Sequence, residues 1–189
     1  MIQKAITFVT SNAIKLEEVR AILGNNNPQL EIISRKLDLP ELQGEIDEIC
    51  IKKCQEAARL LKGPVMVEDT SLCYNALKGL PGPYIKWFIY KLGPEGLNNL
   101  LTGWDDKSAK AISTFAYCSD CEINVKLFQG VVTGQIVAPR GPSDGFDSIF
   151  QPDGFCKTYS ELTKAEKYKI SHRAQALRKI KEYFCKNNV

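Results

Sequence analysis

The chain has 189 residues and a formal net charge of +3, with 44% hydrophobic and 25% charged residues. This composition is that of a globular protein with enough apolar residues for a core, and the length suits one domain over residues 1–189. The small net charge lacks the strongly basic character of nucleic-acid binders, so we expect a small-molecule partner and no nucleic acid.

Hydropathy and cysteine usage predict the compartment. No apolar run approaches the roughly 18 residues that a membrane helix needs, so we expect no membrane contact. Seven cysteines are an odd number, and no secretory pattern stands before them, so we expect free thiols and a cytoplasmic location. Two spaced pairs, Cys50/Cys54 and Cys118/Cys121, lie far along the chain from the single histidine, His172, so core packing is favoured over a metal site for all seven cysteines.

The first 70 residues alternate strands and helices. Residues 4–10 are predicted as a buried strand, and residues 11–24 as a helix with one apolar face that stops at a glycine. A second strand is expected over 30–37, a second helix from Asp47 to a Gly-Pro stop, and a third strand over 65–69. This alternation is typical of α/β proteins.

The rest of the chain changes character after a Gly/Pro-rich turn. Residues 84–93 and 95–103 are predicted as helical, and two long strands are expected over 108–118 and 123–139. Together they suggest a second lobe on the same sheet. A last helix is predicted over 171–184, with Ser171 as its N-cap.

The junction between the first strand and the first helix offers a phosphate site. Thr10, Ser11 and Asn12 lie at the helix N-terminus, where unpaired N–H groups attract anions, and Lys15 is one turn further on. The simpler interpretation is that Ser11 or Asn12 only caps the helix. Neither a Walker loop nor a dinucleotide fingerprint occurs in the chain.

Acidic residues follow the second and third predicted strands. Glu41 lies in a Pro/Gly-bearing loop, and Glu68 and Asp69 are predicted to end the third strand. Strand ends at one edge of an α/β sheet gather functional loops, and carboxylates beside phosphate need a cation such as Mg²⁺ between them. Asp69 is therefore a candidate to hold metal or activate water, or it simply caps the next turn.

Further lysines and a loop complete the candidates. Lys53 lies off the apolar stripe of its helix and Lys86 among aromatics, where a snorkelling side chain is the plain alternative. The loop over 138–155 could form a base pocket, with an aromatic ring for stacking and Asp147 for hydrogen bonds, or merely cover the core. Residues 164–173 are basic and lead into Ser-His-Arg, which suits either an anion site or a solvated face.

In this order, the segments FVTSNAIKLEEV, DLPELQGEIDEI, VEDTSLCYNALKGLPGPYIKWF, GPEGLNNLL, IVAPRG, QPDGF and KAEKYKISHRAQAL resemble the inosine triphosphate pyrophosphatase family. The likeness covers nearly the whole chain and is closest to the eukaryotic branch. It implies an α/β fold with an elongated mixed sheet, flanking helices and two lobes around a central substrate cleft. It also implies a homodimer that uses Mg²⁺, or alternatively Mn²⁺, to hydrolyse inosine and xanthosine triphosphates to monophosphate and pyrophosphate.

The resemblance also implies roles for single residues. Glu41 and Asp69 would bind the metal, and Asp69, Lys15 and Lys53 would be catalytic. Contacts to the nucleotide would come from the following residues: Thr10, Asn12, Lys15, Lys53, Lys86, Phe146, Asp147, Lys167, Ser171, His172 and Arg173.

The chain departs from the family pattern in the loop around Phe146. The usual sequence reads like Phe-Gly-Trp-Asp-Pro, whereas here DGFDSIF is one residue shorter and has Ser148 in place of proline. We therefore expect a working pocket with altered selectivity. Two alternatives stay open: a pyrophosphatase for other modified nucleotides, and a nucleotide-binding module without catalysis, for which the acids would be a disadvantage.

Overall fold

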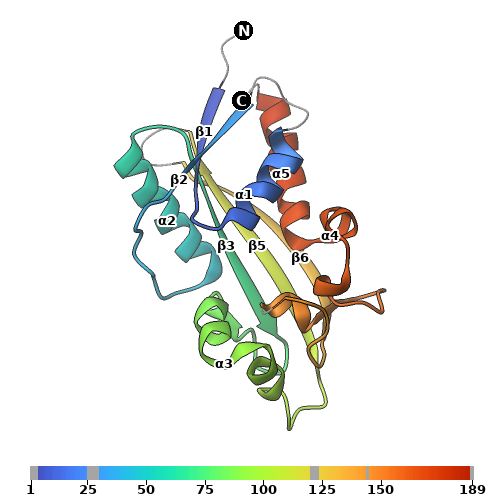
Figure 1. The fold of residues 1–189 in the computed structure, drawn as a ribbon. Coiled ribbons are helices and arrows are strands. Elements are labelled where there is room, and N and C mark those ends of the chain that lie inside the picture. The colour runs from blue at the N-terminus through green and yellow to red at the C-terminus, as the bar shows by residue number, and fades with distance from the viewer. Residues whose placement is uncertain (1–3, 25–29, 120–123, 144, 188–189) are drawn as a thin grey trace. The chain divides into compact units, whose positions relative to one another are not determined.

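The computed structural model describes residues 4–24, 30–119, 124–143 and 145–187, and it has the mixed α/β fold predicted from the sequence (Figure 1). Within these residues seven strands form one mixed sheet. The strands are β1 (Lys4–Val9), β2 (Leu30–Arg35), β3 (Val65–Tyr74), β4 (Pro81–Gly82), β5 (Ser108–Cys118), β6 (Lys126–Ile136) and β7 (Phe150–Pro152). The helices are α1 (Ala13–Val19), α2 (Ile46–Leu61), α3 (Ile85–Asn99), α4 (Lys164–Ile170) and α5 (His172–Asn187).

The strand order is β2-β1-β3-β5-β6-β7, with β4 paired to β3. Strand β1 lies parallel to both β2 and β3, as the alternation of strand and helix predicts. Strand β4 is antiparallel to β3, and β7 is antiparallel to β6. None of the helices formed by the described residues combines the length and apolar composition needed to cross a bilayer.

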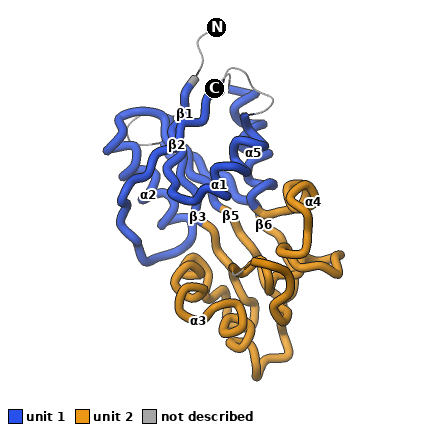
Figure 2. Tube along the Cα trace, viewed as in Figure 1, with its two compact units in different colours: residues 1–69, 114–130, 173–189 blue, residues 70–113, 131–172 orange. Residues whose placement is uncertain are grey.

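The chain divides into two compact units (Figure 2). Unit 1 comprises the chain up to Asp69, Thr114–Gly130, and the chain from Arg173 onward. Unit 2 comprises Thr70–Ser113 and Val131–His172. Three boundaries fall inside β3, β5 and β6, so each of these strands contributes residues to both units, and the fourth falls after His172, the first residue of α5.

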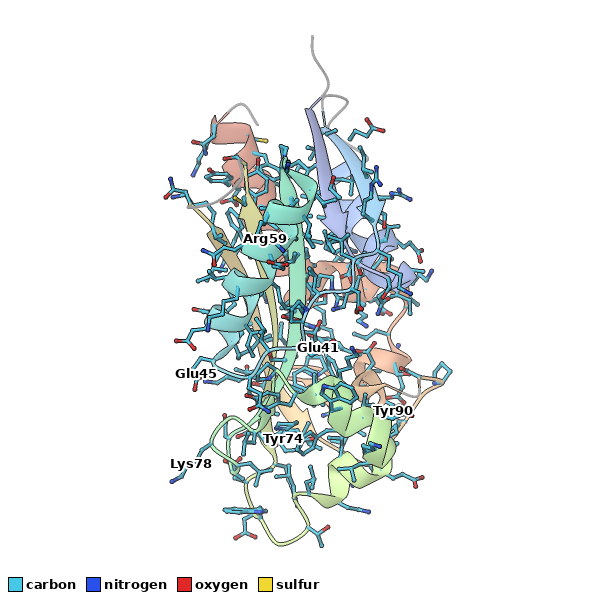
Figure 3. The ribbon with its side chains drawn as sticks, turned by 90° about the vertical axis from the view of Figure 1, so that its left-hand side faces the viewer. Glu41, Glu45, Arg59, Tyr74, Lys78 and Tyr90 are labelled. Carbon is cyan, nitrogen blue, oxygen red and sulfur yellow. The ribbon has the colours of Figure 1, made fainter. Side chains whose placement is uncertain are left out.

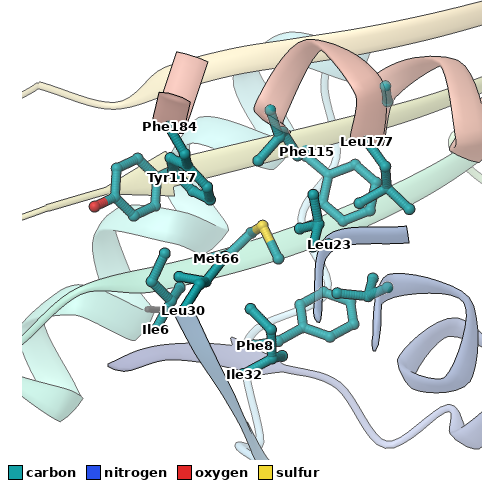
Figure 4. Close-up of a cluster of buried hydrophobic side chains, with 13 residues drawn as sticks. Ile6, Phe8, Leu23, Leu30, Ile32, Met66, Phe115, Tyr117, Leu177 and Phe184 are labelled. Carbon is teal, nitrogen blue, oxygen red and sulfur yellow. The ribbon is translucent and has the colours of Figure 1, made fainter. Parts of the chain in front are cut away.

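Unit 1 has an apolar cluster on each face of its strands. On one face, residues of α1 and α5 pack on the sheet, with Phe8 and Met66 among the strand residues (Figure 4). On the other face, Cys50 and Cys54 of α2 pack with Val65 and Val67. Neighbouring residues of β3 thus alternate between the two clusters, as the period of two in a strand requires. Both α2 cysteines are fully buried, which confirms their prediction as core residues. Cys156 and Cys185 are exposed, so the same prediction was wrong for these two.

Unit 2 has its own core, in which α3 packs against strand residues such as Leu72 and Tyr74. The hydroxyl of Tyr74 donates a hydrogen bond to the Leu97 carbonyl at 3.2 Å. Helix α3 is interrupted where Gly93 adopts φ 66° and Pro94 follows, so the two helical segments predicted here are present and joined by a kink.

Two predictions about the elements need correction. Strand β3 does not end at Asp69 but continues to Tyr74, since Ser71 and Leu72 are fully buried and β4 pairs with this part. Helix α4, seven residues long, was not predicted. Ser171 has an extended backbone directly before α5, so its N-cap role stays a prediction. Cys121, from the second cysteine pair, lies outside the described residues.

Candidate active site

The connection from β1 to α1 is built by short polar side chains in unit 1. Asn12 is the N-cap of α1, and its side-chain oxygen accepts hydrogen bonds from the N–H groups of Ile14 at 3.0 Å and Lys15 at 3.2 Å. The hydroxyl oxygen of Thr10 accepts a hydrogen bond from the Asn12 N–H at 3.1 Å. Asn12, one of the two residues expected to cap the helix, therefore does so, and Lys15 lies one turn into the helix.

Strand β3 continues past the end of β1, so the two acids of β3 lie beside the connection from β1 to α1. Thr7 is opposite Val65 and Phe8 is opposite Met66, so continuing the register by two places puts Thr10 opposite Glu68. Because β1 ends at Val9, Glu68 and Asp69 lie just beyond its carboxyl end. The acids are therefore in the interior of their own strand but at the end of the neighbouring one, where functional loops gather in α/β sheets.

The two acids project to opposite faces of the strand. Asp69 continues the series of Val65 and Val67, which pack towards α2, whereas Glu68 continues the series of Met66, which packs towards α1 and α5. Ion pairs agree with this assignment. Asp69 pairs with Lys53 of α2, and Glu68 pairs with Lys15 of α1 and Arg173 of α5.

On the α2 face, Lys53, Asp69 and Glu41 form an acid–base group. The ammonium group of Lys53 donates to Oδ1 of Asp69 at 2.9 Å. Burial alone would lower the pKa of Lys53, but the Asp69 carboxylate and, more weakly, the Glu41 carboxylate raise it above its usual value. Glu41 lies in the segment that leads into α2 (Figure 3). The predicted metal ligands thus share one lysine as their electrostatic neighbour.

On the α1/α5 face, four charged side chains form a buried network. Arg173 donates from Nη1 to Glu18 at 2.7 Å and from Nε to Glu68 at 3.3 Å. The second oxygen of Glu68 pairs with the ammonium group of Lys15. The side chain of Glu68 is 0% exposed and that of Glu18 is 2% exposed, whereas Lys15 retains 21% exposure. Lys15 and Arg173, predicted separately as nucleotide contacts, are therefore joined through one carboxylate.

The donor set on the α2 face fits a hard cation. Oδ2 of Asp69 is buried and has no hydrogen-bond partner among the described residues, so one carboxylate oxygen is available for a ligand. The described residues contain no group of three or more His, Cys, Asp or Glu side chains arranged to hold a metal. A complete protein cage is not required for Mg²⁺, which commonly uses one or two carboxylates and completes its shell with phosphate and water.

Unit 2 holds an aromatic and basic group around His172. The imidazole is close to two rings, with its centroid 6.0 Å from that of Phe146 and 5.7 Å from that of Tyr159, and it is nearly parallel to the latter. Lys167 pairs with the Asp147 carboxylate, and its ammonium group stands 5.3 Å from the Tyr159 ring centroid. The structure therefore brings four of the predicted residues of this unit into one neighbourhood.

The remaining predicted residues of unit 2 have different surroundings. Ser171 is buried next to His172 in the chain. Lys86 is exposed on α3, and its ammonium group stands 5.4 Å from the Trp87 ring centroid.

The shortened loop is closed by hydrogen bonds from Ser148. Phe146–Ser148 forms a 3-10 turn in which both the N–H and the hydroxyl of Ser148 donate to the Gly145 carbonyl, at 3.3 and 3.0 Å. A proline at this position would have neither donor. The departure from the family pattern thus has its own local stabilisation, and it holds Phe146 and Asp147 in the turn.

Three residues of these groups had no role in the sequence prediction: Glu18, Glu68 and Tyr159. Glu68 was noticed as an acid but not assigned. The alternation of Val65, Val67 and Asp69 against Met66 and Glu68 was the signal that could have separated the two acids by face.

Comparisons with known proteins agree with the fold. Residues 6–183 match the model of the Ham1 family. The chain is similar to a solved HAM1 protein from Coxiella burnetii, with 26% identity, a TM-score of 0.87, and 98% of this chain and 100% of that one covered. It is also similar to the Ham1 protein of Staphylococcus aureus, with 26% identity, a TM-score of 0.81, and coverage of 97% and 100%. A third similar structure is a nucleoside-triphosphatase, or dITP/XTP pyrophosphatase, from Mycobacterium abscessus, with 25% identity, a TM-score of 0.73, and coverage of 94% and 98%.

Proposed function

This chain belongs to the Ham1 family, as a nucleoside triphosphate pyrophosphatase, and we propose that its substrates are deaminated purine nucleotides. These are inosine and xanthosine triphosphates and their deoxy forms, which it would hydrolyse to the monophosphate and pyrophosphate and so remove from the nucleotide pool. The observation that carries the proposal is the Lys53–Asp69 pair with one open Asp69 oxygen, in a chain whose residues 6–183 match the family model. The activity named for the mycobacterial relative supports the choice of substrates. Of the branches within the family, the motifs favour the eukaryotic one.

The reaction needs its charge offset before water can attack. Glu41 and Asp69 are the residues that would hold Mg²⁺, or Mn²⁺, which when bound withdraws negative charge from the phosphate oxygens. Lys15, Lys53 and Lys86 would offset the remaining charge of the triphosphate. With Oδ1 held by Lys53, Asp69 has Oδ2 left for the metal or, in the other role proposed for it, to orient the attacking water and accept its proton. Thr10 and Asn12 would present the start of α1 to the phosphates.

Base selection is assigned to the group around His172. Deaminated purines carry a keto oxygen at position 6 where adenine carries an amino group, so a fixed donor distinguishes them. Lys167, held by Asp147, and Arg173 are the candidate donors. An amino group facing either would leave two donors opposed and unpaired, which rejects ATP. Phe146 would contribute an aromatic face, and Ser171 and His172 would complete the surroundings of the base.

We also propose a cytoplasmic homodimer. Apolar side chains on and beside α3 are unusually exposed for their size, including Trp87 at 49% and Tyr90 at 74%. A second copy of the chain would remove them from water. Sedimentation of the protein and of Tyr90→Glu tests this, since the variant should shift towards the monomer if α3 is the interface.

The proposed function is tested by comparing kcat/KM for ITP, XTP, GTP and ATP. We expect ITP and XTP to be turned over best and ATP to be rejected. The Ser148-closed turn favours ratios that differ from those of a family member with the full loop. Equal kcat/KM for all four nucleotides would refute the assignment of a deaminated-purine enzyme.

The same loop supports the second candidate, a pyrophosphatase for other modified nucleotides. This candidate would be favoured if a methylated or otherwise modified nucleotide exceeded ITP in kcat/KM. A nucleotide-binding module without catalysis is disfavoured because Asp69 would repel an anion in the absence of a cation. It would release no pyrophosphate from any nucleotide.

A further inference from the structure

Glu68 has no assigned role in the proposed reaction, yet it is the most buried carboxylate near it. Its side chain is 0% exposed, and its two oxygens contact two different cations. Oε2 pairs with Lys15 and Oε1 accepts from Nε of Arg173 at 3.3 Å. Burying a carboxylate costs free energy unless cations and hydrogen bonds compensate it, and a neutral residue would avoid that cost. A carboxylate at this position therefore suggests a role beyond packing.

The adjacent acid shows what Glu68 does not do. Asp69 projects towards α2 and keeps one oxygen open, which suits a metal ligand. Glu68 projects to the opposite face, where both of its oxygens contact protein cations. The two acids are consecutive in the sequence, but side chains alternate between the faces of a strand, so the two acids have different neighbours and different proposed roles.

The Glu68 contact leaves the ammonium group of Lys15 with donors to spare. An ammonium group has three donors, and among the described residues the ion pair of Lys15 is the one to Glu68. The lysine side chain is 21% exposed, so donors remain for an outside anion. A long, flexible lysine held in this way loses less conformational entropy when it binds a phosphate.

We propose that Glu68 is a positioning residue that aims Lys15 at the phosphates of the substrate and couples it to Arg173. This inference rests on the proposed function, since it assumes that Lys15 binds the triphosphate. Glu68 itself does not touch the substrate. It acts through Lys15 and through the arginine that directly follows His172 in the chain.

The chemistry of the two partners explains why this residue is an acid and not an amide. Lysine and arginine are donors only, so each needs an acceptor. A carboxylate offers an acceptor to both, whereas the amide group of a glutamine at position 68 would face one of them with a donor. Glu68→Gln is therefore nearly isosteric but breaks one of the two contacts.

Glu18 provides a matched control. Its side chain is 2% exposed, and it pairs with Arg173 at 2.7 Å. Glu18→Gln removes an equal charge from the same network and leaves both members of the Glu68–Lys15 pair in place. If Glu68 acts by positioning Lys15, phosphate affinity should separate the two variants.

The test is calorimetric binding of inorganic tripolyphosphate in buffer with EDTA, which removes the metal and the base from the measurement. We expect Glu68→Gln to raise Kd about 10-fold or more, within the roughly 10- to 100-fold typical of losing a group that orients a ligand. Glu18→Gln, which keeps the carboxylate that contacts Lys15, should stay within about twofold of the wild type. In a Lys15→Met background, Glu68→Gln should cause no further loss.

Several results would overturn the inference: unchanged tripolyphosphate affinity in Glu68→Gln, equal losses of affinity in both glutamine variants, or losses of affinity that add to that of Lys15→Met.

If Glu68→Gln does not fold, Glu68→Asp replaces it, because it keeps the charge but shortens the side chain. It should weaken binding in the wild-type background and not in the Lys15→Met background. ITP turnover by the wild type distinguishes failure of this inference from failure of the proposed function. If the wild type hydrolyses ITP but the variants bind tripolyphosphate as the wild type does, only the inference is wrong. If the wild type does not hydrolyse ITP, the proposed function is wrong as well.

Discussion

Replacing Arg173 by methionine should destabilise the protein strongly, because it removes the partner of a buried carboxylate. Arg173 is 2.7 Å from Glu18 and 3.3 Å from Glu68, and these two acidic side chains are 2% and 0% exposed. Glu68 would keep Lys15, but Glu18 would lose its close ion-pair partner. Breaking a buried pair by removing one member costs about 3–5 kcal/mol. For a chain of this length, 1 kcal/mol shifts Tm by about 2–4 °C, so Tm should fall by roughly 6–20 °C.

The measurement is thermal unfolding followed by far-ultraviolet circular dichroism at pH 7, with two companion variants. Arg59→Met breaks an exposed pair of equal length, 2.7 Å to Glu56, and should change Tm little because solvent screens that pair. Arg173→Met combined with Glu18→Gln should recover part of the loss, since the buried charge is removed as well. If Arg173→Met and Arg59→Met shift Tm equally, the buried network does not stabilise the fold as argued.

Alkylation at pH 8 should label Cys156 and Cys185, which are exposed, and leave Cys54 unlabelled in the folded protein. Burial raises the pKa of Cys54 to about 12, so roughly one part in ten thousand is thiolate at pH 8; mass spectrometry that finds it labelled as fast as Cys156 would contradict this. Gly134→Ala should lower the free energy of unfolding by about 1–3 kcal/mol, because a β-carbon there would come within 2.4 Å of a backbone oxygen of β7. Gly103→Ala, which has open space around it, is the control in the same urea titration, and equal stability of the two variants would argue against the clash.

The regular elements were largely predictable because burial imposes a period on the sequence. Strands β1 and β5 and helix α2 have the apolar repeats that their burial requires, and their bounds agree with the prediction to within a residue or two. The prediction ended strand β3 too early because Glu68, Asp69, Thr70 and Ser71 are four polar residues in a row, a composition typical of a turn. That these residues continue the strand depends on neighbours that are distant in the sequence.

Helix α4 shows a different limit of sequence interpretation. None of its residues is buried, so it has no apolar stripe to detect. A signal was nevertheless present, since Thr163 and Glu166 form a capping box, with both reciprocal hydrogen bonds made. Attention to the start of the helix, and not to its faces, would have found it.

The sequence named the candidate site residues singly, but it did not predict which of them form ion pairs. The motif resemblance pointed to Lys15, Lys53, Asp69 and Arg173 one at a time. Which acid pairs with which base depends on strand register and on the faces that the helices cover, and neither is encoded locally. In the sequence Glu18 is one acid among others in an amphipathic helix, and its ion pair becomes apparent only when the fold brings Arg173 of α5 next to it.

The central claim is that Asp69 serves a cation-assisted release of pyrophosphate. The most direct measurement is the product formed from ITP by the wild type and by Asp69→Asn, with and without Mg²⁺, assayed separately for pyrophosphate and orthophosphate. We predict pyrophosphate from the wild type with Mg²⁺ only, and almost none from Asp69→Asn under either condition. Equal pyrophosphate release by both proteins, or orthophosphate as the main product, would contradict the account.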